Sequence, residues 1–410
     1  MMTKKLATAV CIVVENLPVP LDRRVWKEAC ALRDAGYRVS VICPKGKGAF
    51  TAAYEVLDGV EIYRHRSWEA SSVFGYVLEY GSALVAEFLL TLRVFARTRF
   101  RILQACNPPD TIFLIALLLK PFGVRFIFDH HDLGPELFEA KFGKRDGPLY
   151  RLALLAERCS FQVASTCIAT NESFKEIAVG RGGKDPESVF VVRNCPDLAN
   201  FRRAQNQPVN KFGKSMVVTY VGFMGSQDGL DLLLESIEHI VKTQNRRDTH
   251  FVLVGGGTVI SELQATIAKK KLEDYVTLTG QVSHDQVAMY LSSADLGVAP
   301  DPKNAMNDHS TMVKIFEYMA FALPVVLFDL KEGRRLAGPA ALYAVPNDPI
   351  DFANQVIKLL DCKELREQLG ERGRRRIEEE LNWEIEKRTL LRAYDAALQP
   401  SALIVTESNV

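Results

Sequence analysis

The sequence lacks the long apolar runs and the charge excess that would place it across a membrane or on nucleic acid. No window has the eighteen or more uninterrupted apolar residues of a membrane-spanning helix, and the longest apolar stretch, 73–101, is broken by Glu79 and Glu87. Lys and Arg number 51 against 50 Asp and Glu, so no overall field favours nucleic acid. With 410 residues, 48% of them hydrophobic, the chain is globular and too long for one core. We therefore expect two domains.

The sequence also lacks any cysteine pattern that would indicate disulfides or a structural zinc ion. Its eight cysteines are scattered, without a CxxC pair or a Cys/His cluster. Scattered thiols are typical of a reducing compartment. We therefore expect a cytoplasmic protein with neither disulfides nor a structural zinc site.

Two familiar nucleotide-binding motifs are missing. No GxGxxG is followed by an acidic residue about twenty positions later, which disfavours a nicotinamide-dependent oxidoreductase. No GxxxxGK[ST] occurs either, which disfavours a P-loop nucleotide hydrolase. A nucleotide site, if present, must be built in another way.

What the chain does have is a repeated alternation of short β-branched runs with helical patterns, which predicts two doubly wound α/β domains. The first set of strands is predicted at 6–14, 38–43, 60–64, 101–105, 124–129, 166–170 and 189–193. The second is predicted at 216–222, 250–255, 275–280, 296–300 and 323–328. The polar stretch 197–214 reads as the linker, so the domains are predicted at 1–200 and 210–380, with a C-terminal helix at about 382–400 packing back on the first.

Ligands of such sheets bind at the carboxyl ends of the strands, so the residues just after each predicted strand are the informative ones. Gly222 and Gly225 follow one strand and Gly255 follows the next, where glycine lets the backbone approach a ligand closely. Glycine also serves simply to turn a chain, so each loop alone is a weak signal. Together with the helix described next, they favour a nucleotide-phosphate site.

The stretch 309–329, HSTMVKIFEYMAFALPVVLFD, predicts a helix over 312–322 with Ser310 or Thr311 as its N-cap. Lys314 then lies in the first turn, where the helix end is already positive and a cation is disfavoured. A bound anion would resolve this conflict, because free backbone N–H groups and a lysine make a phosphate site. A solvated lysine is the alternative.

In the first domain, 129-DHHDLGPELFEAKF-142 follows a predicted strand. Its His131, Asp132 and Glu136 could bind substrate by hydrogen bonds, ligate a metal or act as acid and base. Helical spacing of the histidines is absent, which disfavours a metal, and one of them could be a buried histidine satisfied by backbone.

The loop after the first predicted strand carries Asp22, Arg23 and Arg24. The two arginines could hold an anionic donor or acceptor. Asp22 also has a plain explanation as a helix cap.

Three segments together resemble the family 4 glycosyltransferases, which have the two-domain fold called GT-B. They are FEYMAFALPVV (316–326), ADLGVAPD (294–301) and VVRNCPDLANF (191–201), and the resemblance extends over essentially the whole chain. It implies two Rossmann-like domains facing a cleft. It also implies a hexosyltransferase that moves a sugar from a nucleotide diphosphate donor, UDP- or GDP-linked, with retention of configuration.

The resemblance implies roles for residues at matching positions. Glu317 would hydrogen-bond the donor ribose, the backbone of 310–313 would meet the diphosphate, and Lys314 would add charge to it. The segment from Gly280 to Val282 would hold the base, and His131 would lie near the transferred sugar. A diphosphate at this place would thus explain why Lys314 lies in the first turn of a helix.

The chain departs from the family pattern at three places. His309 stands where the first of two glutamates eight residues apart is usual, so recognition of the sugar hydroxyls must differ. The usual Arg and Lys after the first strand of the second domain are replaced by Gln227 and Asp228, so Lys314, with Arg193 or Arg23, would supply the phosphate charge.

The third departure is 20-PLDRR-24, which stands where a glycine pair is expected. These features resemble a subgroup that builds bacterial surface polysaccharides. No Asp-x-Asp occurs, so neither a divalent metal nor another cofactor is expected, and retention without a carboxylate nucleophile favours front-face attack.

The acceptor is expected to be a glycan or a lipid-linked sugar at the inner face of the plasma membrane. The reason is the helical stretch 73–101, whose basic end next to leucine and phenylalanine is typical of a helix lying on an anionic membrane; it carries Arg93, Arg97, Arg99 and Arg101. A core helix with a snorkelling basic end is the alternative. Nucleic acid is not an expected partner.

Two other functions stay open. His309 and the missing Arg and Lys suit a non-catalytic subunit that binds a sugar nucleotide. A GT-B-like epimerase acting on a UDP-sugar would need the same donor site but no acceptor.

Overall fold

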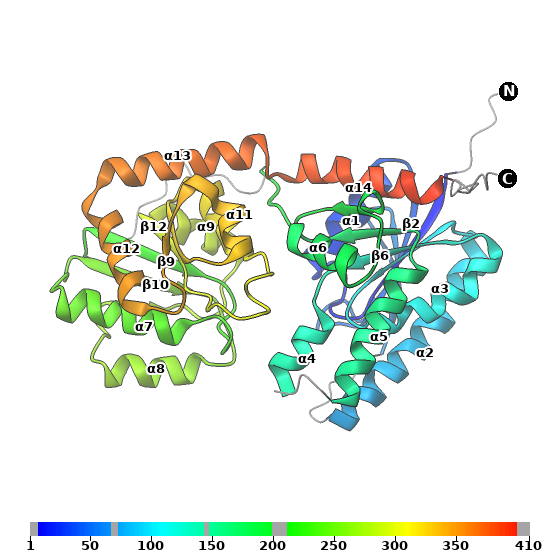
Figure 1. Cartoon of the computed structure of the whole chain (residues 1–410), viewed down its shortest axis with the longest axis horizontal. Helices are drawn as coiled ribbons and strands as arrows, with labels where there is room; N and C mark the ends of the chain where they lie inside the picture. The colour runs from blue at the N-terminus through cyan, green and yellow to red at the C-terminus, as the bar shows by residue number, and fades with distance from the viewer. Residues whose placement is uncertain (1–6, 67–72, 143–146, 199–210, 400–410) are drawn as a thin grey trace, which may run out of the picture. The chain divides into compact units, whose positions relative to one another are not determined.

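The computed structural model describes residues 7–66, 73–142, 147–198 and 211–399, and the chain forms two compact units (Figure 1). The first unit comprises the chain up to Val192 together with the segment from Lys387 onward, and the second unit comprises Arg193–Glu386. Most of the predicted linker 197–214 lies outside the described residues. The three charged C-terminal helices are α12 (Pro349–Asp361), α13 (Lys363–Glu379) and α14 (Trp383–Leu398), and α14 crosses from the second unit into the first.

The first unit is built on an eight-stranded sheet in the order β3-β4-β2-β1-β5-β6-β7-β8. All neighbouring pairs are parallel except β3–β4. The strands are β1 (Ala9–Val14), β2 (Arg38–Pro44), β3 (Tyr54–Leu57), β4 (Val60–His65), β5 (Ile102–Cys106), β6 (Arg125–His130), β7 (Thr166–Ala169) and β8 (Val189–Val191).

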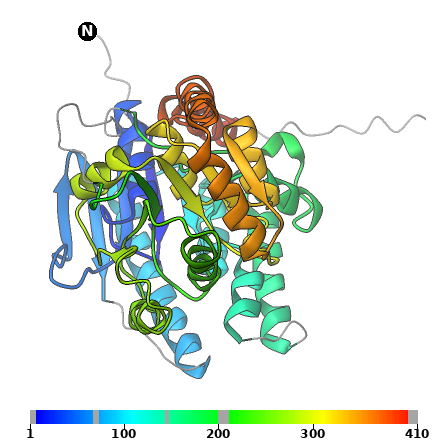
Figure 2. The same ribbon diagram turned by 90° about the vertical axis from the view of Figure 1, so that its left-hand side faces the viewer.

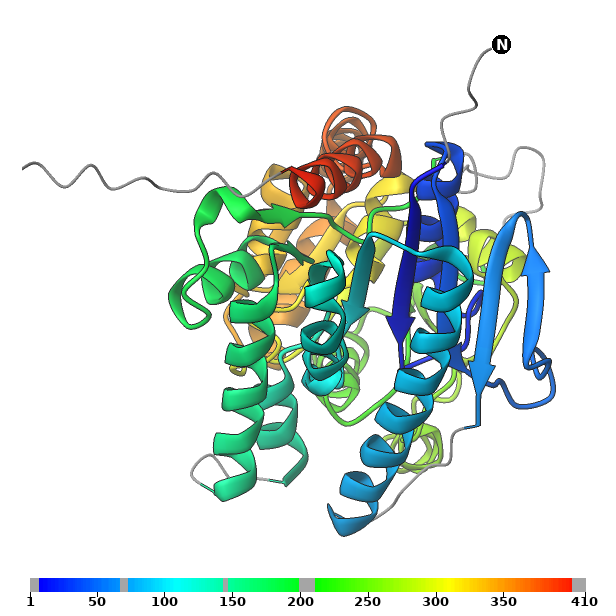
Figure 3. The same cartoon turned by 90° about the vertical axis from the view of Figure 1, so that its right-hand side faces the viewer.

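Helices cover both faces of this sheet (Figure 3). One apolar cluster joins the strands to α2, α3, α5 and α6, while α1 packs on β1 and β2 and α14 reaches β5 through a side-chain hydrogen bond. The helices are α1 (Arg23–Asp34), α2 (Val73–Thr98), α3 (Phe113–Leu119), α4 (Gly134–Phe142), α5 (Pro148–Val163) and α6 (Glu172–Gly180). Short 3₁₀ turns lie at Asp110–Ile112, Lys120–Phe122 and Pro186–Ser188.

The second unit has a six-stranded parallel sheet in the order β11-β10-β9-β12-β13-β14. Its strands are β9 (Met216–Val221), β10 (Thr249–Val254), β11 (Val276–Leu278), β12 (Leu296–Ala299), β13 (Val325–Phe328) and β14 (Ala341–Ala344). The inner strands β9, β10, β12 and β13 are buried on both faces, as parallel strands covered by crossover helices must be. Both sheets are doubly wound, as the sequence predicts.

Helices lie on both faces of this sheet (Figure 2). Two apolar clusters of side chains divide these helices between the two faces. The first cluster contains α7 (Leu230–Glu238), α8 (Ile260–Lys269) and α12, and the second contains α9 (His284–Ser293), α10 (Val313–Ala320) and α11 (Lys331–Ala337). A π-helix at His239–Thr243 continues α7, and a 3₁₀ turn at Gly338–Ala340 precedes β14.

Candidate functional site

Strand order places a topological switch point in the second unit. Strand β9 lies between β10 and β12, so its two neighbours are reached by connections running in opposite directions. Ligands of open α/β sheets bind at the carboxyl ends of the strands at such a point. The loop that begins at Gly222 and the loop that begins after Ala299 both leave the sheet there.

Tyr318 fixes helix α10 at this switch point. Its hydroxyl accepts a hydrogen bond from the Val221 N–H at 2.9 Å and donates to the Val298 carbonyl at 3.0 Å, so it bridges β9 and β12. Gly297 makes room for the ring, because a Cβ there would lie 2.4 Å from it. Sequence analysis missed Tyr318, although it stands one turn after Lys314 on the same helix face.

Lys314 is buried at the switch point and already has a counter-ion. Its Nζ lies 2.8 Å from Asp301 Oδ1, and the two side chains are 8% and 3% exposed. The same ammonium is 4.7 Å from the centre of the Tyr220 ring and 3.4 Å from its hydroxyl. Burial lowers the pKa of Lys314, but the Asp301 carboxylate outweighs it and the net direction is upward. Lys314 is therefore a buried, charged lysine, and the alternative of a solvated lysine does not hold.

The predicted cap of this helix is also wrong. Helix α10 begins at Val313, its N-cap is Met312, and it ends at Ala320. Ser310 instead donates its hydroxyl to the Met306 carbonyl at 2.8 Å, because the preceding segment forms a turn of its own. Within the described chain no side-chain hydrogen bond caps this N-terminus. A helix end of this kind suits an anion.

The glycines pack two loops against each other, and their predicted close approach to a ligand stays a prediction. A Cβ on Gly255 would lie 1.9 Å from the Gly222 carbonyl oxygen, and one on Gly257 would lie 2.2 Å from the Met224 carbonyl oxygen. Gly255 also forms an isolated bridge with Gly280. The glycines thus hold the ends of β9, β10 and β11 together at the edge of the candidate site.

The remaining predicted donor residues have the following surroundings. The Gly225 N–H donates to Asp228 Oδ2 at 2.9 Å, and burial raises the pKa of Asp228 although Lys314 opposes it. Glu317 is half-buried on α10, and Val282 packs on the apolar cluster that includes this helix. The Thr311 side chain is half-buried just before α10.

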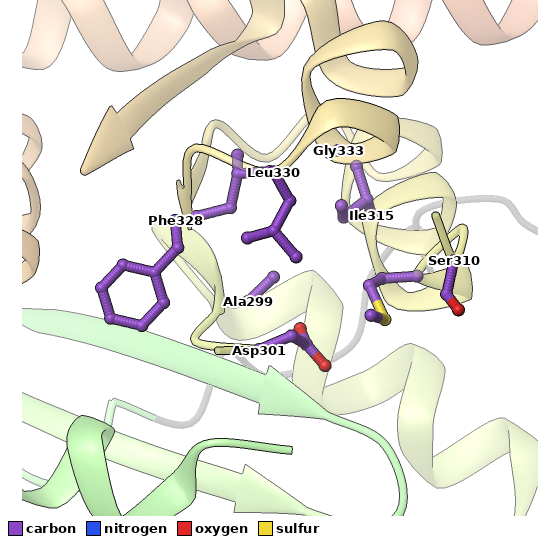
Figure 4. Close-up of a pocket in the computed structure, with 9 residues that line it drawn as sticks. Ala299, Asp301, Ser310, Ile315, Phe328, Leu330 and Gly333 are labelled. Atoms are coloured by element: carbon purple, nitrogen blue, oxygen red, sulfur yellow. The ribbon is translucent and has the colours of Figure 1, made fainter. Parts of the chain in front are cut away.

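A small cavity lies beside the ion pair (Figure 4). Its volume is about 10 Å³, and its lining includes Asp301, Ser310 and Phe328. That volume holds about one water molecule and is far too small for a sugar nucleotide. Asp301 Oδ2, buried and without a hydrogen-bond partner among the described residues, is a natural partner for such a water.

In the first unit, His131 is held by a buried charge network at the end of β6. Its Nε2 lies 2.8 Å from Asp129 Oδ2, and Arg24 Nη2 lies 3.1 Å from the other oxygen of that carboxylate. Burial lowers the pKa of His131, but Asp129 outweighs it and raises the net value. The same Nε2 also lies 2.8 Å from Arg24 Nε, so this ring nitrogen faces both a guanidinium donor and a carboxylate. Arg24 pairs with Glu28 at 3.2 Å and donates to the Val192 carbonyl at 2.7 Å.

This network extends to the C-terminal helix. Gln104 donates to Glu28 at 2.7 Å and to Asp129 at 2.8 Å, and its carbonyl oxygen accepts a hydrogen bond from the Tyr394 hydroxyl. Burial raises the pKa of Glu28 to about 7. Helix α14 thus contacts the partners of His131, a link that residue spacing could not reveal.

Metal ligation at this place is disfavoured by the charges around it. Ligand atoms of Cys106, Asp129 and His131 lie within 4.8 Å of one another. The Arg24 guanidinium, however, already neutralises Asp129. We therefore interpret this cluster as an ion-pair network.

His130 is the buried histidine of the pair, but backbone does not satisfy it. Neither ring nitrogen has a hydrogen-bond partner within the described residues, and Nε2 lies 3.4 Å from Glu157. The rings of Phe161 and Phe174 pack on it with centroid distances of 5.1 Å and 5.0 Å.

Several residues predicted to bind substrate or phosphate have other partners. Glu136 accepts two hydrogen bonds from Arg181 at 2.6 Å and 3.1 Å, and Arg193 lies 3.4 Å from Glu386. Asp22 is the N-cap of α1, accepting from the Val25 N–H. The other two predicted residues of these loops are placed as follows: Arg23 is exposed and Asp132 is half-buried beside His131.

Comparisons with known proteins agree on one kind of protein for both units. Residues 21–195 match the family described as "Glycosyl transferase 4-like domain", and residues 215–362 match "Glycosyl transferases group 1". A relative, alpha-D-kanosaminyltransferase of Streptomyces kanamyceticus, is 28% identical over 172 residues, which are 42% of this chain and 43% of the relative. The chain thus spans less than half the length of that relative.

Solved structures resemble the whole chain. Sucrose-phosphate synthase of Thermosynechococcus elongatus superposes with a TM-score of 0.77 at 18% identity, covering 95% of this chain and 98% of that one. The Anabaena protein HepE in complex with UDP and glucose gives a TM-score of 0.70 at 13% identity, covering 95% and 100%. Identities this low establish the fold alone.

Proposed function

Since the chain belongs to the family 4 glycosyltransferases and has their GT-B fold, we propose that it transfers a sugar from a UDP- or GDP-linked donor, with retention, to a glycan or lipid-linked acceptor. The observation that carries the proposal is the buried Lys314 at the N-terminus of α10, above the β9–β12 switch point. The donor diphosphate would lie there, and the relative HepE binds UDP.

The chemistry follows from where charge develops. Departure of a nucleoside diphosphate leaves negative charge on the phosphate oxygens, which the Lys314 ammonium and the first-turn N–H groups of α10 stabilise. Glu317, on the same helix, would bind the donor ribose. His131 would donate a hydrogen bond to the transferred sugar, with its ring held by Asp129. No divalent cation is required at the diphosphate in this mechanism.

A non-catalytic sugar-nucleotide binding subunit is the second candidate. It is favoured by the Lys314–Asp301 pair, in which the cation expected to meet the phosphate is already neutralised. In the catalytic proposal, the diphosphate replaces Asp301 as the partner of Lys314 when the donor binds.

Release of nucleoside diphosphate from UDP- and GDP-sugars by the purified full chain, with and without EDTA, separates these candidates. We expect EDTA-resistant release that Lys314→Ala and Glu317→Ala abolish. The matched control, Lys303→Ala, removes an exposed lysine from the same unit and should leave release unchanged. Donor binding without any release, with or without added acceptor glycans, would favour the non-catalytic subunit. An epimerised sugar nucleotide formed without acceptor would instead identify an epimerase.

The acceptor side of the proposal is a contact with the inner face of the plasma membrane through 73–101. None of the described helices is both long and apolar enough to cross a bilayer. Helix α2 nevertheless exposes an apolar stripe with the spacing of one helix face, comprising Leu78 (50%), Val85 (59%), Leu89 (60%) and Leu92 (40%).

Neighbouring helices on the same face of the sheet enlarge this apolar surface. Phe122, after α3, is 68% exposed and its ring lies 5.8 Å from that of Phe95 on α2. Further exposed side chains are Leu114, Leu117 and Leu118 on α3 and Leu152 and Leu155 on α5. Basic side chains at the end of α2 suit an anionic lipid surface.

Co-sedimentation with vesicles of anionic and of neutral lipid tests the membrane contact. Charge reversal of the four basic residues at the end of α2 should abolish binding to anionic vesicles: Arg93→Glu, Arg97→Glu, Arg99→Glu and Arg101→Glu. The control reverses four exposed charges of the second unit: Lys358→Glu, Lys363→Glu, Arg372→Glu and Arg375→Glu. Equal binding of the α2 variant and the wild type would contradict the contact.

A further inference from the structure

Three buried ionisable side chains meet in the first unit, outside the site described above. Glu15 directly follows β1, His65 ends β4, and Glu87 lies on α2, which packs on both strands. The residues are 8%, 6% and 0% exposed. One ligand atom from each lies within 4.8 Å of the others. Residue spacing gave no hint of the cluster, because its members stand 50 and 22 positions apart in three different elements.

The hydrogen bonds of His65 determine which ring nitrogen faces the carboxylates. Nδ1 lies 3.1 Å from the Arg66 carbonyl oxygen, which can only accept, so Nδ1 carries a proton. Nε2 lies 3.0 Å from Glu15 Oε2. In the neutral ring this nitrogen presents a lone pair to a carboxylate oxygen, a repulsive contact unless a positive charge lies between them. Ring orientation by a backbone carbonyl is typical of histidines that ligate metals.

Glu87 lacks hydrogen-bond partners for its whole carboxylate group in the part of the chain that the structure describes. Both of its carboxylate oxygens are buried, and neither has a hydrogen-bond partner among the described residues. A buried carboxylate without donors or a counter-charge is strongly destabilising. The Thr91 hydroxyl, one turn later on the same helix, is likewise buried without a partner within the described chain. Burial and the Glu15 carboxylate raise the pKa of Glu87 well above its usual range.

We propose that Glu15, His65 and Glu87 bind a divalent transition-metal ion, with Zn²⁺ as the fitting species. One imidazole nitrogen with two carboxylates is a donor set that zinc accepts, whereas calcium prefers six to eight oxygens. A bound ion would supply the positive charge that the His65 lone pair and the two carboxylates require. It would join α2 to the carboxyl ends of β1 and β4, so its role is structural, and it is independent of the proposed glycosyl transfer.

The competing arrangement uses protons in place of the metal. A protonated Glu87 would donate to Glu15, which would pair with a His65 imidazolium. This arrangement needs no metal, and it predicts that Glu87→Gln, which keeps an N–H donor at the same place, leaves the protein unchanged.

Metal analysis of the full chain distinguishes the two arrangements. The protein is expressed in zinc-supplemented medium and purified without chelator, and its zinc content is measured by mass spectrometry. We expect about one zinc per chain in the wild type and in the control Glu79→Gln, which changes a second glutamate of α2, and less than a tenth of that in Glu87→Gln and His65→Asn. Loss of an outer partner weakens metal binding roughly 10–100-fold, so loss of a direct ligand should exceed that.

A second readout protects the test against misfolding of a variant. Removal of zinc with a chelator should lower the melting temperature of the wild type, and zinc should restore it, while Glu87→Gln should respond to neither treatment. Substoichiometric zinc in the wild type, or equal zinc content in the wild type and Glu87→Gln, would overturn the proposal. An unchanged melting temperature after complete removal of zinc would also overturn it.

Discussion

The ion pair between Lys314 and Asp301 leads to an unusual expectation for Asp301→Asn. The substitution leaves a buried ammonium without its carboxylate, which lies 2.8 Å away in the native pair. Breaking a buried ion pair from one side destabilises a protein by roughly 3–5 kcal/mol. We expect the lower end of this range, because the Tyr220 ring and the Asp228 charge still act on Lys314.

Nucleotide binding should change in the opposite direction. If the donor diphosphate replaces Asp301 beside Lys314, then removing the carboxylate removes a competitor. We expect Asp301→Asn to bind the preferred nucleoside diphosphate at least about tenfold more tightly, equivalent to about 1.4 kcal/mol. A ligand at 100 times its dissociation constant would then restore about 2.7 kcal/mol of the lost stability.

Hydrogen exchange resolved by peptide is the suitable assay, because the two units need not unfold together. Peptides from β9 and β10 should exchange roughly 100-fold faster in the variant without nucleotide, corresponding to about 3 kcal/mol. The control is Asp329→Asn, which breaks the exposed pair with Arg334 and should cost no more than about 1 kcal/mol. Unchanged or weaker nucleotide binding by Asp301→Asn would refute the exchange of partners.

Three further predictions follow, two for the framework of the second unit and one for a buried carboxyl of the first unit. Tyr318→Phe leaves the N–H of β9 and the carbonyl of β12 without their buried partner, so the second unit should lose roughly 2–5 kcal/mol, measured by the same exchange. Gly255→Ala places a methyl group 1.9 Å from a carbonyl oxygen at a φ of +137° and should abolish nucleotide binding in calorimetry, whereas Gly280→Ala, with nothing within 4 Å, should cost about 1–2 kcal/mol and leave binding measurable. Burial raises the pKa of Asp110 from 3.8 to about 7, so the native state keeps a proton that the unfolded state has lost. The stability of the first unit should therefore fall between about pH 4 and pH 7, by up to roughly 1.4 kcal/mol per pH unit, and Asp110→Asn should flatten this dependence in denaturation measured at several pH values. An equally steep slope in Asp110→Asn would contradict that assignment.

The sequence predicts the two sheets well because buried parallel strands are short β-branched runs. It misses β3, although Asp58 and Gly59 join it to β4, both with positive φ, in the turn that an Asp-Gly pair favours between two strands. The half-exposed residues of β3 hide it from a search for buried runs. It misses β14 because Ala-Leu-Tyr-Ala has little β-branched character.

For the candidate site too, the sequence predicts some residues and misses others. Lys314 stands out in the sequence because its charge conflicts with the end of a helix. Its partner Asp301 does not, because the two residues stand 13 positions apart and the fold of the loop between them decides whether they meet. The prediction of Ser310 as the N-cap is wrong for a related reason. Its hydroxyl donates to the Met306 carbonyl in the preceding turn, a contact that depends on the fold of that loop. Local propensities predict elements, whereas contacts formed through loops depend on the folded chain.

The most direct test of the central claim is calorimetric titration of the full chain with UDP, GDP, ADP and dTDP, in wild type and in Lys314→Ala, with and without magnesium. The account predicts that one nucleoside diphosphate binds the wild type, that magnesium does not alter its affinity, and that Lys314→Ala loses it. Absence of binding to all four, or undiminished binding by Lys314→Ala, would contradict a diphosphate site at the N-terminus of α10.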